Sequence, residues 1–156
     1  MLTSLQGQFA IWSYARRNTV HFLAQLSDTD LLKKLPRKTF ATIFEQIAEM
    51  AWVQKCFVEG IGSGEMDSTN WNVPAFKAKD ELFTLLNDTD EKMKNLLEKC
   101  SGNEEVAWNS NSRNVHEVVS LMIMHETMHL GQIIAFCNAL GIVVPEDIVK
   151  GLFLTS

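Results

Sequence analysis

The segment 113–140, RNVHEVVSLMIMHETMHLGQIIAFCNAL, decides the fold. Apolar residues recur through it at helical spacing, and no proline interrupts it. Gly141 follows at the position where a helix commonly ends, and Pro145 prevents the helix from continuing. We therefore predict one long helix that begins near Arg113 and ends at Ala139 or Leu140.

Three further stretches have helical periodicity and lie between the predicted connections. They cover about 5–26, 39–59 and 75–99. In the first of them, Arg16 and Thr19 fall on the same stripe as Trp12 and Leu23. Four long helices with almost no two-residue alternation predict an all-α protein, a four-helix bundle.

The connection between the second and third helices is unusually long for a bundle. We expect Gly60, Gly62 and Gly64 to end the second helix, and a polar segment of about a dozen residues reaches Pro74. A loop of this length can carry the chain over the bundle, so these two helices need not be antiparallel neighbours. Later in the chain, 106–108 is expected to be briefly extended.

Composition narrows the class of protein. The chain has 156 residues, which fits a single domain over 1–156, and its net charge of −5 gives no basic footprint for nucleic acid. No stretch approaches the ~20 apolar residues of a membrane span, and the N-terminus has no signal-peptide pattern. Three distant cysteines without a CxxC pair argue against a disulfide framework. We expect a cytoplasmic protein.

Two histidines stand on the apolar stripe of the last helix. At about 100° per residue, His129 lies only about 40° from His125. Val118, Met122 and Phe136 fall within about 60° of His125, so both imidazoles should face the core. Spacing of four residues places the two rings side by side, which suits two ligands of one metal ion.

The second helix carries a polar residue on its own apolar stripe. Gln46 is centred between Ile43, Met50 and Phe57, and burying its amide without a partner would cost about 1–3 kcal/mol. One polar cluster of Gln46, His125 and His129 would satisfy all three groups. A metal ion at its centre is one arrangement, and direct hydrogen bonds with trapped water are another.

The run HETMH also matches the HExxH pattern of zinc proteases. We do not favour that reading, because a protease needs a third ligand downstream and no histidine follows His129. Glu126 falls about 100° from His125, at the edge of the stripe, where it could orient a ligand histidine.

Several runs, in their order and spacing, resemble the DinB/YfiT-like superfamily. They are HETMHLGQIIAFCNALGI at 125–142, IWSYARRN at 11–18, SDTDL at 27–31 and TIFEQIAEMAWV at 42–53. The resemblance spans almost the whole chain. It implies a bundle that holds one divalent metal, commonly zinc or nickel, through three histidines, one from the second helix and two from the fourth.

Carried over to this sequence, the resemblance assigns His125 and His129 as the fourth-helix ligands. The second-helix ligand falls on Gln46, an amide where the superfamily has histidine, and Glu49 one turn further on is a candidate substitute ligand. Members of the superfamily include thiol-dependent S-transferases and other enzymes of small-molecule metabolism. The implied function is a metal-dependent S-transferase or hydrolase acting on a small molecule or thiol. The Gln46 departure keeps open an alternative, a non-catalytic bundle with a degenerate site that binds a ligand or serves structure.

The last helix is also apolar on a second face. Ile123, Leu130 and Ile134 fall about 140–180° from His125. A helix that is apolar on two faces is buried on two sides, so we predict a homodimer through this helix. The alternative is that other parts of the same chain cover that face.

Overall fold

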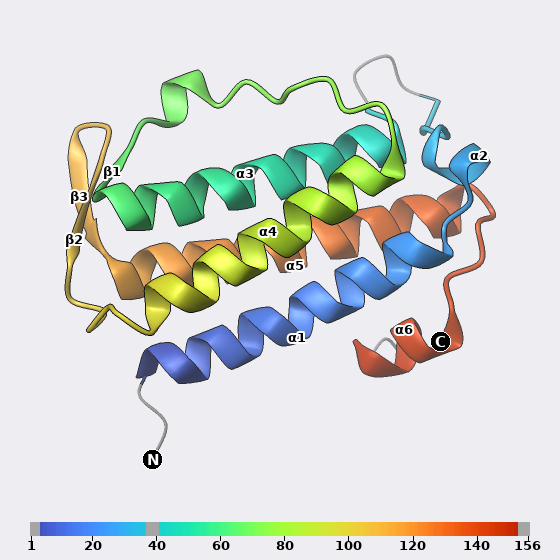
Figure 1. The fold of residues 1–156 in the computed structure, drawn as a ribbon. Helices are drawn as coiled ribbons and strands as arrows, with labels where there is room; N and C mark the ends of the chain where they lie inside the picture. Colours follow the sequence, from blue (N-terminus) through green and yellow to red (C-terminus); the bar gives the residue numbers. More distant parts are fainter. Residues whose placement is uncertain (1–3, 37–40, 153–156) are drawn as a thin grey trace.

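The structure, a computed structural model, describes residues 4–36 and 41–152. Four long helices lie side by side and form a bundle (Figure 1). They are α1 (Ser4–Gln25), α3 (Ile43–Ser63), α4 (Lys79–Leu97) and α5 (Val115–Ala139). The predicted all-α four-helix bundle is confirmed.

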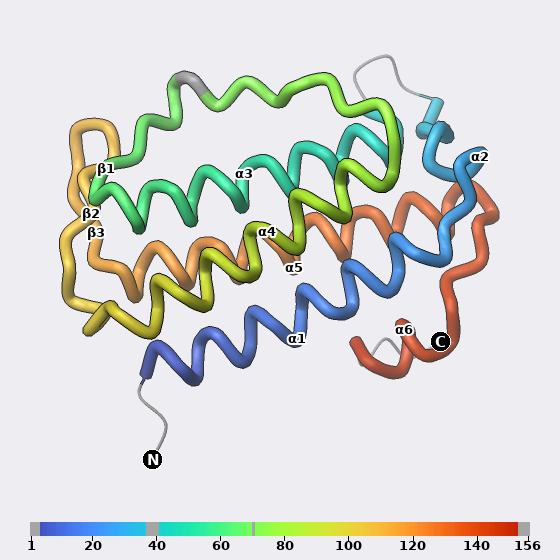
Figure 2. The backbone as a smooth tube through the Cα atoms, in the orientation of Figure 1, coloured from blue at the N-terminus to red at the C-terminus, as the bar shows by residue number. Residues whose placement is uncertain are grey.

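The path of the chain confirms that α3 and α4 are not antiparallel neighbours. The crossover, residues 64–78, returns along the length of α3, so α4 runs in the same direction as α3 (Figure 2). It contains a short strand, β1 (Glu65–Met66), and one turn of 3₁₀ helix, η1 (Ser68–Asn70). One long segment of backbone therefore lies beside α3, the helix that carries Glu49.

Helix α3 differs from its predicted bounds at both ends. The predicted start at Thr39 lies outside the described residues, and the helix begins after Thr42, which forms a capping box with Glu45. The helix continues through Gly60 and ends only at Gly64, whose φ of 76° is left-handed. Gly60 lies within the helix, and the buried side chain of Met66 packs where a Cβ of residue 60 would stand.

A small sheet closes one end of the bundle. Strand β2 (Glu105–Trp108) pairs with β1 in parallel and with β3 (Asn111–Asn114) in antiparallel. The expected extended stretch at 106–108 is thus confirmed as part of a strand. Helix α5 begins at Val115 rather than near Arg113, because residues 111–114 are paired in the sheet.

Two short helices complete the other end. Helix α2 (Asp28–Leu31) follows the cap residue Ser27, and α6 (Glu146–Gly151) follows Pro145. Helix α5 contributes to both apolar core clusters and contacts α1 and α3. Among the described residues it is the one helix long and apolar enough to span a membrane, but 44% of its most apolar window is buried inside the bundle.

The second apolar face of α5 is covered within the same chain. Leu130 is 3% exposed and Ile134 is 5% exposed, and both belong to the core cluster that includes Phe22 of α1. Ile123 is partly buried against the other cluster. The apolar face of α5 on which the homodimer prediction was based is therefore not available to a second copy. The oligomeric state is not tested by these contacts and stays a prediction.

Charged side chains are buried where α1, α4 and α5 meet. Arg16 is 2% exposed; its Nε lies 3.0 Å from Asp90 Oδ1 and its Nη2 lies 3.4 Å from Glu126 Oε2. Thr19 donates a 2.6 Å hydrogen bond to Glu126 Oε1, and the guanidinium lies over the Trp12 ring. The guanidinium contacts are ion pairs rather than aligned hydrogen bonds. This buried ion cluster, formed by Arg16, Asp90 and Glu126, joins three helices. In it the Glu126 side chain points toward α1.

The close approach at Gly60 predicts that Gly60→Ala destabilises the protein by about 1–3 kcal/mol, since the new methyl group displaces Met66. Gly131→Ala is the matched control, because Gly131 is exposed on α5 with nothing near its Cβ position. That variant should gain about 0.5–1 kcal/mol from the lower entropy of its unfolded chain. Urea unfolding measures both, and equal effects of the two substitutions would contradict the packing described.

The buried ion cluster predicts that Arg16→Met destabilises by about 3–5 kcal/mol, because it leaves Glu126 buried without a cation. Arg17→Met, one residue away on the exposed side of α1, should change stability by no more than about 0.5 kcal/mol. Thermal unfolding of the two variants is the measurement. A similar small effect for both would show that Arg16 is not required beside Glu126.

Asp90 predicts a pH dependence. Burial raises the pKa of its carboxyl from 3.8 to about 6, with Arg16 opposing this rise and Glu126 adding to it. The folded protein thus holds a proton that the unfolded chain has lost, so stability falls as pH rises from about 4 to about 6. Asp90→Asn should unfold at higher urea than wild type at about pH 7.5, and the gap should close near about pH 4. An unchanged gap across this range would refute the assignment.

Candidate metal centre

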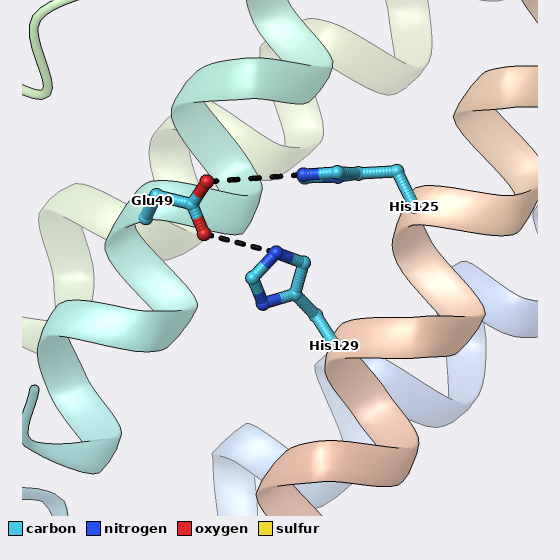
Figure 3. A group of neighbouring side chains, drawn as sticks. All are labelled: Glu49, His125 and His129. Atoms are coloured by element: carbon cyan, nitrogen blue, oxygen red, sulfur yellow. Dashed lines mark ion pairs between the residues drawn. The ribbon is translucent and has the colours of Figure 1, made fainter. Parts of the chain in front are cut away.

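Helices α3 and α5 bring together one carboxylate and two imidazoles. Glu49 on α3 faces His125 and His129 on α5 (Figure 3). The Nε2 atom of His129 lies 2.9 Å from Glu49 Oε2, and Nε2 of His125 lies 3.9 Å from Glu49 Oε1. One ligand atom from each residue falls within 4.8 Å of the others, so the three could hold one metal ion.

The two histidines have the arrangement that their spacing predicts. They lie one turn apart on α5, with ring centroids 4.5 Å apart and ring planes at 58°. Both project toward α3 rather than toward solvent (Figure 3). Because the backbone of a helix fixes this spacing, the pair is preorganised for a common ligand.

Exposure changes across the centre. The side chain of His129 is 9% exposed, that of His125 15%, and that of Glu49 42%. The histidines therefore form the inner wall and the carboxylate forms the rim. A small molecule can approach the group from the side of Glu49.

The histidines also set the charge of Glu49. The neighbouring imidazoles of His125 and then His129 lower the pKa of the Glu49 carboxyl to about 2, and burial opposes this shift only in part. Glu49 is therefore a carboxylate at neutral pH. A deprotonated carboxylate is the form that binds a metal ion.

The donor set fits a divalent ion of the zinc type. Two imidazole nitrogens and one carboxylate oxygen form the set that several catalytic zinc sites use. Tetrahedral zinc with bonds of about 2.0–2.2 Å would separate its ligand atoms by roughly 3.3–3.6 Å. With one ligand atom taken from each residue, all separations in this group are within 4.8 Å, so small side-chain movements would bring the three to this range. The Nδ1 atoms of both histidines are buried, and no residue within 4–36 and 41–152 makes a hydrogen bond to either of them.

Gln46, the expected second-helix ligand, makes a hydrogen bond in the structure through the nitrogen of its amide. Its side chain is buried, and its Nε2 donates a 3.4 Å hydrogen bond to the backbone carbonyl of Ala41. Its Oε1 is buried and has no hydrogen-bond partner among the described residues. The residue of α3 that meets the histidines is Glu49, one turn further along. Glu49 is the substitute that the sequence offered, and its carboxylate lies near both histidines.

Glu126 contacts neither histidine through its carboxylate. That side chain is fully buried on another face of α5, where Thr19 and Arg16 contact it. The expectation that it orients a ligand histidine has no support in these contacts. The glutamate of the HETMH run is also turned away from the position of a general base, which removes the basis for a protease.

Aromatic side chains lie beside the centre. Phe57 of α3 packs edge-on against Trp71 of the crossover and Trp108 of β2, with centroids 5.4 and 5.5 Å away. The ring of His125 lies 6.2 Å from that of Phe57. Trp71 therefore anchors the crossover to the bundle next to the metal centre, and periodicity could not have placed it there.

The remaining histidines and the cysteines lie in other surroundings. His21 contacts Asp147 near the C-terminal end, and His116 contacts Gln8. The three cysteines are unpaired, and burial raises the pKa of every thiol, that of Cys137 to about 11. The chain's own thiols are therefore poor nucleophiles at neutral pH.

Comparison with known proteins agrees with this fold. The sequence profile of the DinB superfamily matches residues 11–133. Among solved structures, the chain is similar to YjoA, a DinB-like protein from Bacillus subtilis, with a TM-score of 0.69. Their sequences are 19% identical, and the match covers 89% of this chain and 96% of that one, which supports the fold alone. A search of curated proteins found no match. Since the profile covers most of the chain, including all three candidate ligands, the protein belongs to the DinB superfamily.

Proposed function

We propose that Glu49, His125 and His129 bind one divalent metal ion, zinc or nickel, and that the protein is a metal-dependent enzyme of small-molecule chemistry. The observation that carries this proposal is the convergence of two imidazoles and a deprotonated carboxylate within 4.8 Å. Three protein ligands leave further coordination positions open, as in catalytic rather than structural zinc sites.

A metal ion in this site would act as a Lewis acid that lowers the pKa of a thiol or of water. The protein itself supplies an inner wall of buried histidines and a rim at Glu49 that faces solvent. Because the three cysteines have raised pKa values, the nucleophile would come from outside the chain. A small thiol or water is the natural candidate, so the reaction we propose is thiol-dependent S-transfer or hydrolysis.

The second candidate is a non-catalytic bundle that binds a ligand or serves only structure. It is favoured by the 2.9 Å contact between His129 and Glu49, which satisfies both groups without a metal ion. Under this alternative the polar cluster would add no metal affinity. For either candidate we propose a cytoplasmic location, because the three cysteines are unpaired and thiols stay reduced in the cytoplasm.

Metal content distinguishes the two candidates. Protein purified without a histidine tag or chelator should carry close to one zinc or nickel ion per chain. Glu49→Ala and His129→Ala should each lower metal affinity by about 100-fold or more, since even indirect support of a ligand is worth about 10–100-fold. Gln46→Ala is the control, because its amide donates to Ala41 instead, and it should retain the metal.

The outcome decides which candidate holds. Equal metal affinity of wild type and Glu49→Ala would overturn the proposed site. Metal bound by wild type and lost from Gln46→Ala would return the third position to Gln46. If wild type binds no divalent ion and unfolds at the same temperature with and without zinc, the non-catalytic candidate stands.

A further inference from the structure

A cavity of about 400 Å³ lies between α3 and the crossover, directly beside the metal centre. Ala48 and Glu49 form part of its α3 wall, and Val73, Ala75 and Phe76 form part of its wall on the crossover. Glu49 belongs both to this cavity and to the three-residue centre. A molecule in the cavity would therefore touch the carboxylate at the rim of the metal centre.

The lining of the cavity is mainly apolar. Of its two acidic residues, Glu45 is already engaged, because its Oε2 accepts hydrogen bonds from the backbone and hydroxyl of Thr42. Glu49 faces the histidines. Val73 is 39% exposed although it is a large apolar residue, so its side chain is available to a ligand. The cavity therefore has a mainly apolar wall and one carboxylate, that of Glu49, at the side of the candidate metal centre.

A second cavity of about 520 Å³ continues from the first. Phe44 and Phe76 line both, so the two are separated by no more than this aromatic pair. The second cavity has a polar rim that includes Asp28, Lys77 and Asp80. The first cavity lies at Glu49, and the second lies at the start of α4.

We infer that this pocket, between α3 and residues 73–76 of the crossover, binds the apolar body of a neutral small-molecule substrate. The reactive end of that molecule faces Glu49, His125 and His129. In the metal-free protein, the carboxylates of Glu45 and Glu49 in the wall of the pocket disfavour an anionic ligand through like-charge repulsion. A volume of this order suits a molecule of drug-like size. The inference rests on the proposed function for the role of the metal centre, but the pocket can be tested without a metal ion.

The test of the pocket uses a matched pair of fluorescent probes. N-phenyl-1-naphthylamine is neutral, and 1-anilinonaphthalene-8-sulfonate carries a sulfonate on the same aromatic skeleton. Wild type should bind the neutral probe at one site and bind the anionic probe about ten-fold more weakly. Ala75→Trp fills the pocket from the exposed crossover and should weaken neutral-probe binding by about ten-fold or more. Ala135→Trp, at an exposed position of α5, is the control and should bind as wild type does.

The position of the pocket beside the metal centre is tested by quenching. Cobalt(II), with a partly filled d shell, quenches a nearby fluorophore, whereas zinc does not. Wild type loaded with cobalt should therefore show quenched neutral-probe emission, and zinc-loaded wild type should not. His129→Ala lacks a proposed ligand, so cobalt should leave its probe emission unchanged.

The probe affinities test whether the pocket exists, and the quenching tests whether it lies beside the candidate metal centre. Equal probe affinity in Ala75→Trp and wild type would overturn the pocket, as would preference for the anionic probe. Unquenched emission in protein that mass spectrometry shows to be cobalt-loaded would overturn its position beside the centre. If no cobalt binds, the proposed function fails, and the comparison of Ala75→Trp with Ala135→Trp still decides the pocket.

Discussion

A buried carboxylate needs a cation beside it, and in this protein that requirement sets the orientation of the central helix. Glu126 is fully buried, and Arg16 supplies the positive charge from α1 while Asp90 contacts the same guanidinium from α4. Leaving either charge alone in the core would cost several kcal/mol. The rotation of α5 about its axis that places Glu126 beside Arg16 also fixes the direction in which the other faces of α5 point. His125 and His129, about 60–100° round from Glu126, then face α3.

The same rotation explains why a protease-like pattern has a different meaning here. In HExxH proteases the glutamate serves as a base next to the metal that the two histidines bind. In this bundle the glutamate faces α1 and stabilises helix packing, while the histidines meet a carboxylate from another helix. A five-residue pattern thus yields a structural glutamate and a candidate metal centre on two faces of one helix.

The topology gives this centre its surroundings. Because α3 and α4 run in the same direction, the chain must return along α3, and the crossover lies against the helix that carries Glu49 (Figure 1). Trp71 fixes the crossover at one point, by packing on Phe57 near His125. Further along, Val73 and Phe76 enclose the cavity that reaches Glu49. In a simpler bundle such a connection only joins two helices. In this protein it also forms part of the wall of a cavity.

The sequence by itself determined the features that depend on neighbours along the chain. The four helices, the long crossover and the pairing of His125 with His129 follow from helical periodicity and from turn residues, which act locally. Only the tertiary structure decided that Glu49 rather than Gln46 meets the histidines, since both lie near the inner side of α3 and one turn separates them. It also decided that Arg16 pairs with Glu126, and that Leu130 is buried in the core of the same chain. These choices depend on the rotation of each helix against its neighbours, which packing of the whole core and the pairing of buried charges set together.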